Sequence, residues 1–192
     1  MDFEVLTARL MRLVRLDTSV FDEVRMDPTA TMSSFIVVVG ASFAAGFGGF
    51  LWWLVQDFPD NGKVFMQSFI LGSIFASGLW IVWLFVAYVL LTQVFRERAD
   101  LQQLVRTMGM AAAPLALSIL MFIPGIDFGI ALISVTLLFG LTHVAIQTTT
   151  TADTARVLAA NVAGFAVWAV VLTLLVSDTT YLAPGIFISN PY

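Results

Sequence analysis

The chain has 192 residues, of which 59% are hydrophobic and 11% charged, and its mean hydropathy is +0.94. About a quarter of the residues of a soluble globular domain are charged, so this composition excludes that class and indicates an integral membrane protein. The formal net charge of −4, with nine Lys and Arg spread along the chain, excludes nucleic acid as a partner, and the lack of cysteine excludes disulfides and Cys-ligated metal sites.

The first 33 residues precede any segment that could cross a membrane. As a helix, "FEVLTARLMRLVRL" places apolar side chains on one face and Arg9, Arg12 and Arg15 on the other. Such an amphipathic helix can lie along the inner leaflet with these arginines at the membrane surface. Packing of the helix on the cytoplasmic loops of the protein is the alternative. In "MDPTATM", Asp27 is a candidate N-cap with Pro28 at the first helical position.

Five stretches of 20 or more residues lack any charged side chain, and each is long enough to cross a bilayer as a helix. The sequence therefore predicts an all-α, polytopic transmembrane bundle of five spanning helices plus the N-terminal amphipathic helix. We expect a cytoplasmic segment at 1–33, a five-helix transmembrane domain at 34–176 and a short non-cytoplasmic tail at 177–192. The predicted spans run from Ser34 to Val55, Met66 to Phe95, Met108 to Ile123, Phe128 to Gln147 and Val157 to Val176.

The third predicted span has the weakest pattern. Pro114 lies inside it, and Pro124 and Gly125 follow its end. Because proline removes a helical hydrogen bond, we expect a kink at Pro114 and a turn at Pro124–Gly125. A re-entrant hairpin in place of a full crossing is the alternative.

The basic residues give the predicted orientation. Eight of the nine lie before span one, between spans two and three, or between spans four and five, and only Lys63 lies in a connection on the other side. Because Lys and Arg are enriched in cytoplasmic loops, we expect a multi-pass protein of the plasma membrane with a cytoplasmic N-terminus and a non-cytoplasmic C-terminus.

Small residues are concentrated in "GASFAAGFGG", within span one. At four-residue spacing they form two adjacent stripes on span one and one on span two, which are Gly40, Ala44 and Gly48; Ala41, Ala45 and Gly49; and Ser68, Gly72 and Ala76. In lipid, helices associate through close backbone contact that small residues permit, so we expect spans one and two to pack here. A groove for the helix of another protein or for a lipid is the alternative.

His143, the only histidine, and Asn161 lie at similar distances from the turn between spans four and five. Their depth predicts an interhelical hydrogen bond between them. The alternatives are a proton or ion path, ligation of a haem or pigment, and exposure to lipid headgroups.

The turn between these spans, "TTTTADTAR", is rich in hydroxyl groups. We expect it to cap helix ends, with Asp153 as the N-cap of span five. Phosphorylation or anion binding is the alternative.

No predicted span contains Asp, Glu, Lys or Arg, which argues against a coupled transporter. A single histidine with no G-x-S-x-G motif and no nearby carboxylates also argues against intramembrane hydrolysis and metal catalysis. We therefore expect no enzymatic activity, no catalytic or metal-binding residues and no cofactor.

The segments "RTMGMAAAPLALSILMFIPG", "LISVTLLFGLTHVAIQTTTTADTARVLAANVAGFAVWAVV" and "MDPTATMSSF" together resemble the Yip family of membrane proteins, named for interaction with Ypt/Rab GTPases. The likeness lies in the proline of span three, the Pro-Gly turn, the small residues leading into span five and the Asp-Pro before span one. It implies a five-span fold. The Asp-Leu-Tyr-Gly-Pro motif of eukaryotic members is absent, so the chain resembles the prokaryotic type and a Rab-type GTPase is not an expected partner.

These features predict a non-enzymatic membrane scaffold or adaptor that interacts with membrane lipids and with other integral membrane proteins. Two alternatives are an accessory structural subunit of a larger membrane complex, such as an energy-transducing one, and a small channel or transporter.

Overall fold

The computed structural model describes residues 3–56 and 60–178, and the predicted tail at 177–192 lies almost wholly outside them. Within these residues the chain is helical, and its only β-type pairing is an isolated bridge between Ala99 and Thr150. The α-helices are α1 (Phe3–Val14), α2 (Val20–Met26), α3 (Ala30–Val55), α4 (Asn61–Val64), α5 (Gly72–Val89), α6 (Leu101–Ala111), α7 (Asp127–Gln147) and α8 (Thr154–Asp178). Three further segments are the π-helices η1 (Phe65–Leu71) and η2 (Leu90–Val94) and the 3₁₀-helix η3 (Ala113–Phe122).

Five helical segments are long and apolar enough to cross a membrane, which confirms the prediction of a multi-pass helical membrane protein. They are Ala30–Val55, Asn61–Val94, Leu101–Phe122, Asp127–Gln147 and Thr154–Leu174. These segments begin earlier than predicted, because each helix starts before the apolar stretch, in four of the five cases with residues that include a charged side chain.

The third segment changes its geometry at Pro114. The α-helix α6 ends at Ala111, and η3 continues the same segment as a 3₁₀-helix. Proline has no N–H to give to the carbonyl four residues back, so the α-helical pattern cannot continue through it. The N–H of Leu115 instead bonds the carbonyl of Ala112 at 3.0 Å. After η3, Pro124 and Gly125 lie in the turn to α7, and Gly125 has a φ of +88°, which favours glycine.

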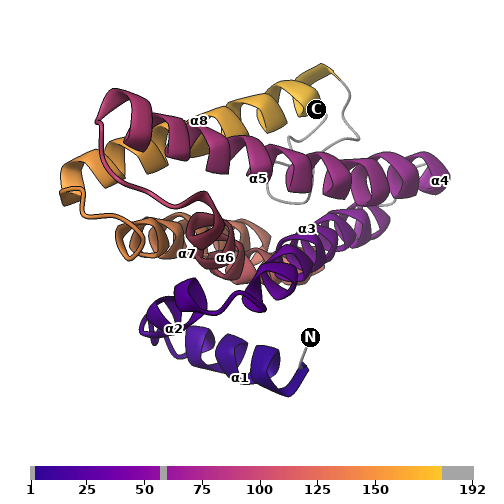
Figure 1. Ribbon diagram of the computed structural model, residues 1–192. Coiled ribbons are helices and arrows are strands. Elements are labelled where there is room, and N and C mark those ends of the chain that lie inside the picture. The colour runs from indigo at the N-terminus through magenta and orange to yellow at the C-terminus, as the bar shows by residue number, and fades with distance from the viewer. Residues whose placement is uncertain (1–2, 57–59, 179–192) are drawn as a thin grey trace.

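The five segments form a closed ring. Contacts join α3 to α5, α5 to α8, α8 to α7, α7 to η3, and η3 back to α3. Along the ring the segments therefore follow the order one, two, five, four, three (Figure 1).

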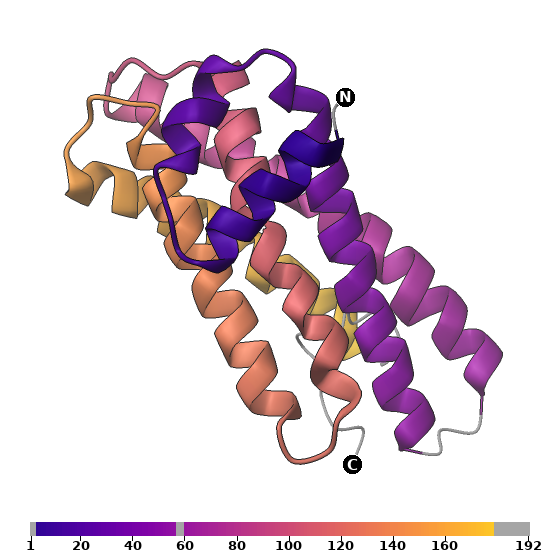
Figure 2. The same cartoon turned by 90° about the horizontal axis from the view of Figure 1, so that it is seen from below.

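Figure 2 shows α1, α2 and the connections at 95–100 and 148–153 at one end of the bundle, with the 123–126 turn at the other end. We call the first end the arginine-rich end, because Arg9, Arg12, Arg15, Arg25, Arg96, Arg98, Arg106 and Arg156 belong to the segments that meet there.

The centre of the ring is filled by tryptophan. Trp80, Trp83 and Trp168 are at most 4% exposed and belong to the main hydrophobic core. An internal cavity between them and the neighbouring helices measures about 10 Å³, which is space for about one water molecule. The described bundle is therefore tightly packed around these three tryptophans.

The N-terminal helices pack on the bundle as a second core. Leu6 and Leu13 of α1 join Phe21 and Val24 of α2 in a buried cluster that includes Met110 and Leu141. Arg9 differs from the expectation of a cation at the membrane surface. It is 8% exposed, because its guanidinium is held between Glu23 and Asp27 at 2.8 Å each.

Candidate functional site

The small residues of α3 face two different neighbours. A Cβ on Gly46 would collide with the Ser73 hydroxyl and lie 3.0 Å from the Phe69 carbonyl oxygen. A Cβ on Gly48 would collide with the Ser118 carbonyl oxygen and lie 2.7 Å from the Ile119 Cα atom of η3. The segment thus packs against the second span at one position and against the third span two residues later.

The predicted stripe of Gly40, Ala44 and Gly48 is wrong as a single packing face. Gly40 is exposed and a Cβ there would have nothing within 4 Å, and Ala44 is only half-buried. The adjacent stripe of Ala41, Ala45 and Gly49 is buried, and both alanines belong to the main core. The four-residue spacing of small residues showed which segment of α3 packs closely. It did not show which of its faces makes the contact, because α3 packs against two neighbouring segments and not against one.

On the second span, Ser68, Gly72 and Ala76 are all buried. The Ser68 carbonyl lies 3.3 Å from a Cβ placed on Gly46. The Ala76 carbonyl accepts a hydrogen bond of 3.4 Å from Trp168 Nε1 of α8. This stripe therefore contacts span one near Ser68 and span five near Ala76.

The predicted hydrogen bond between His143 and Asn161 does not form. Asn161 is fully buried, and its Oδ1 accepts a hydrogen bond of 3.2 Å from Trp83 Nε1. Its Nδ2 donates to the Phe139 carbonyl at 3.1 Å. The distance of each residue from the turn predicted that both lie at a similar depth in the membrane. It could not predict the rotation of α7 about its own axis, which brings the Phe139 carbonyl, and not the His143 side chain, to Asn161.

His143 instead borders a shallow pocket of about 250 Å³ with Gln147 and Thr154. Its Nδ1 is buried and has no hydrogen-bond partner among the described residues.

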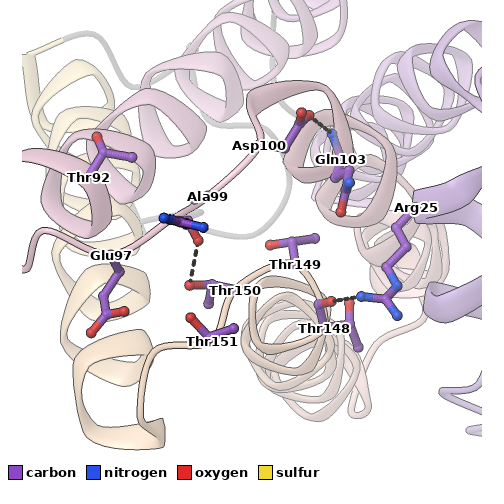
Figure 3. A pocket seen from close by; sticks show the side chains of 11 residues that line it. Arg25, Thr92, Glu97, Ala99, Asp100, Gln103, Thr148, Thr149, Thr150 and Thr151 are labelled. Carbon is purple, nitrogen blue, oxygen red and sulfur yellow. Dashed lines mark hydrogen bonds between the residues drawn. The ribbon is translucent and has the colours of Figure 1, made fainter.

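A polar cleft of about 500 Å³ opens at the arginine-rich end (Figure 3). It lies between the end of the second span, the start of α6 and the threonine turn, and its lining includes Arg25, Glu97, Arg98, Asp100, Gln103 and Thr148–Thr151. The mixture of two cations, two carboxylates and several hydroxyls suits a polypeptide surface with alternating charge better than a simple anion.

The threonine run was the one feature of this cleft that the sequence analysis singled out. Charged residues immediately after a span are a signal that could have found the others.

The hydroxyls of the turn close the helix ends around this cleft. Thr148 and Thr149 donate to the carbonyls of Ala145 and Ile146 in the last turn of α7, each at 2.8 Å. Asp153 Oδ1 accepts from the Arg156 N–H at 2.9 Å, which is the geometry of an N-cap on α8. Thr150 donates to the Arg98 carbonyl at 3.0 Å (Figure 3).

The charges at this end divide into paired and unpaired groups. Arg12 pairs with Asp17 and Glu23 at 2.8 Å each, and Arg156 pairs with Glu97. The side chains of Arg15, Arg96 and Arg98 are exposed and form no ion pair or hydrogen bond with the described part of the chain. These three cations are therefore free for an external partner.

Hydrogen bonds at the α2–α3 connection stabilise the charged form of Asp27. Its Oδ1 accepts from the Thr29 hydroxyl at 2.6 Å and from the Thr29 N–H at 2.9 Å, which caps the turn that leads into α3. The Thr29 hydroxyl, followed by the Arg9 guanidinium, lowers the pKa of Asp27 to about 2.

In the described residues no group of three or more His, Asp or Glu side chains is placed to hold a metal ion. Comparisons of the chain with protein-family models, with curated proteins and with solved structures find no match.

Proposed function

We propose that the protein is a non-enzymatic scaffold of the plasma membrane that holds other integral membrane proteins or lipids at its arginine-rich end. The observation that supports this function over a channel or transporter is the packing at the centre of the ring. Three buried tryptophans meet there around an internal cavity of about 10 Å³, which is smaller than a hydrated ion needs.

The distribution of unpaired charge supports the arginine-rich end as the interaction surface. Arg98 lines the polar cleft and Arg96 precedes it by two residues; both are exposed, and neither side chain has a partner among the residues described. Exposed charges without internal partners contribute to the specificity and association rate of a complex. Lys63, at the opposite end of the second span, has an internal interaction.

The proposal includes a cytoplasmic arginine-rich end. Eight of the nine basic residues belong to segments that meet at this end, which is the asymmetry expected of cytoplasmic loops. The proposed relation to prokaryotic Yip-type proteins rests on the proline of span three, the Pro-Gly turn and the five-span plan.

The test is purification of the tagged protein from its native membrane in mild detergent, with quantification of every co-purifying protein. We expect one partner to stay at a fixed ratio with the wild type and with Lys63→Glu, and to be lost from Arg98→Glu. Equal recovery with all three proteins would contradict docking at the arginine-rich end. Solute or ion flux in reconstituted vesicles above protein-free vesicles would favour a channel over a scaffold.

A further inference from the structure

A second surface at the arginine-rich end is apolar instead of polar. A groove of about 420 Å³ runs between α1, η3 and α7, and every residue that lines it is apolar, including Leu10, Leu13, Leu117, Leu120, Leu137 and Leu141. Its volume lies within the range of about 300 to 1,000 Å³ that is usual for small-molecule sites. We propose that this groove binds an acyl chain of an anionic phospholipid, whose phosphate lies at Arg15.

The backbone of the third span creates the groove. Past Pro114 the segment continues as the narrower 3₁₀-helix, and it presents Ala113 and Ala116 to the space under α1. The end of α1 crosses above this space with Leu13, Val14 and Leu16. The groove therefore has two small residues, Ala113 and Ala116, among the larger apolar side chains of η3 and α7, and it is covered by apolar side chains from the end of α1.

The position of the groove among apolar, lipid-facing side chains favours a lipid as its occupant. The proposal rests on the membrane placement in the proposed function, because η3 and α7 belong to segments that are long and apolar enough to cross a membrane. Leu117 and Leu120 are each 40% exposed in the groove, and Leu132 of α7 is 56% exposed outside it. In a bilayer the medium that contacts these side chains is lipid, so acyl chains are the molecules present at the groove.

Arg15 supplies the charge that complements a phosphate. It is exposed and without an ion pair among the described residues, whereas Arg9 and Arg12 of the same helix are held by carboxylates. Val14 and Leu16 flank it in sequence and line the groove. An exposed cation that adjoins two lining residues of an apolar groove complements the two parts of an anionic phospholipid, the charged headgroup and the acyl chain.

The turn after α1 keeps Leu16 at this mouth. Leu16 has a φ of 58°, in the left-handed region that glycine normally occupies at the end of a helix. The N–H of Leu16 donates to the Leu13 carbonyl at 2.9 Å, and the N–H of Asp17 donates to the Arg12 carbonyl at 3.0 Å. These two hydrogen bonds at the end of α1 hold Leu16 in its strained backbone conformation. Leu16 is nevertheless 59% exposed, and an acyl chain in the groove would cover it.

Photo-crosslinking tests this proposal in the full chain. The protein is reconstituted in vesicles that contain phosphatidylglycerol with a diazirine on one acyl chain, and the labelled residues are mapped by peptide mass spectrometry. We expect more labelling at the groove residues of η3 and α7 than at Leu132, and competition by unlabelled phosphatidylglycerol. Leu117→Trp, which fills the groove, should reduce this labelling, while the matched change Leu132→Trp outside the groove should not.

Arg15→Gln tests the charge at a residue that plays no part in packing. We expect it to lower the preference for phosphatidylglycerol over phosphatidylcholine by about fivefold, as for the loss of one basic residue near an anionic lipid. Labelling spread evenly over all exposed apolar residues, or an unchanged preference in Arg15→Gln, would overturn the proposal while leaving the scaffold function intact. A lack of labelling on every span would overturn the membrane placement and therefore both proposals.

Discussion

The indole Nε1 of Trp83 donates a hydrogen bond of 3.2 Å to Oδ1 of Asn161 in the buried centre of the bundle. Since Asn161 also donates to the Phe139 carbonyl, a single side chain links α5, α7 and α8. Close backbone approach accompanies this link, because a Cβ on Gly164 would collide with Trp83. Asn161 is therefore the polar centre of the contact between spans two, four and five.

Replacing Asn161 by leucine should destabilise the fold. The change leaves the buried Trp83 N–H without its acceptor and removes the second hydrogen bond to the Phe139 carbonyl, so we expect a loss of about 1 to 2 kcal/mol. Unfolding of the purified protein in mixed detergent micelles measures this loss.

His143→Leu is the matched control for Asn161→Leu. Because His143 has no hydrogen-bond partner in the described chain, its replacement should change the unfolding free energy by less than about 0.5 kcal/mol. Equal losses in the two variants would contradict the assignment of Asn161.

Adding one methyl group to α3 should have opposite consequences at two glycines. In Gly48→Ala the new Cβ meets the backbone of Ser118 and Ile119, which cannot move aside as a flexible side chain could. We expect destabilisation of about 1 to 3 kcal/mol from this overpacking. Gly40→Ala adds the same atom where nothing lies within 4 Å. Because alanine loses less backbone entropy than glycine in a helix, we expect this variant to be more stable than the wild type by up to about 1 kcal/mol. A destabilised Gly40→Ala protein would show that α3 packs on another face.

The sequence predicted the helical class and the number of membrane segments, because long apolar stretches bounded by charges can satisfy their backbone in lipid only as helices. The cap at Asp153 was also predictable, since it depends on residues close in sequence. The order of the helices in the ring was not, because apolar surfaces in lipid carry no strong directional signal. Gly109 illustrates the limit: a Cβ there would come within 2.6 Å of Ser34 Cβ, yet Gly109 was in none of the predicted stripes.

Charged residues were misjudged for a related reason. The helical pattern placed Arg9 on a polar face, but this face meets Glu23 of a second helix, which the pattern did not predict, and Asp27, which follows that helix. Whether an arginine faces water or a carboxylate depends on tertiary structure. The groove and the polar cleft likewise combine residues that are far apart in sequence, so periodicity could not identify either.

The attachment of α1 and α2 should depend on pH. The pKa of Asp27 is about 2 in the folded chain, against an ordinary value of 3.8. Because the folded value is the lower one, its contribution to stability is complete above about pH 5 and is lost as the pH falls from about 4 towards 2. We expect hydrogen-exchange protection of the α1 amides, corrected for intrinsic rates, to fall across this range.

Two substitutions separate this effect from general acid unfolding. Asp27→Asn should lower the protection of α1 at pH 7 and weaken its pH dependence. Asp22→Asn changes a neighbouring carboxylate whose ion pair with Arg25 is exposed, and exposed pairs contribute little, so it should behave as wild type. Unchanged protection in Asp27→Asn would rule out Asp27 as the attachment of α1.

The most direct test of the five-crossing account is the labelling of single cysteines, which the chain lacks in its native form. Asn61 and Thr151 are both exposed. Asn61 begins α4 and Thr151 belongs to the 148–153 connection, and these two segments lie at opposite ends of the bundle (Figure 1). With a maleimide that cannot cross membranes, Asn61→Cys should react in intact cells and Thr151→Cys only after the membrane is opened. Reaction of Thr151→Cys in intact cells, or of both positions from one side, would contradict the account.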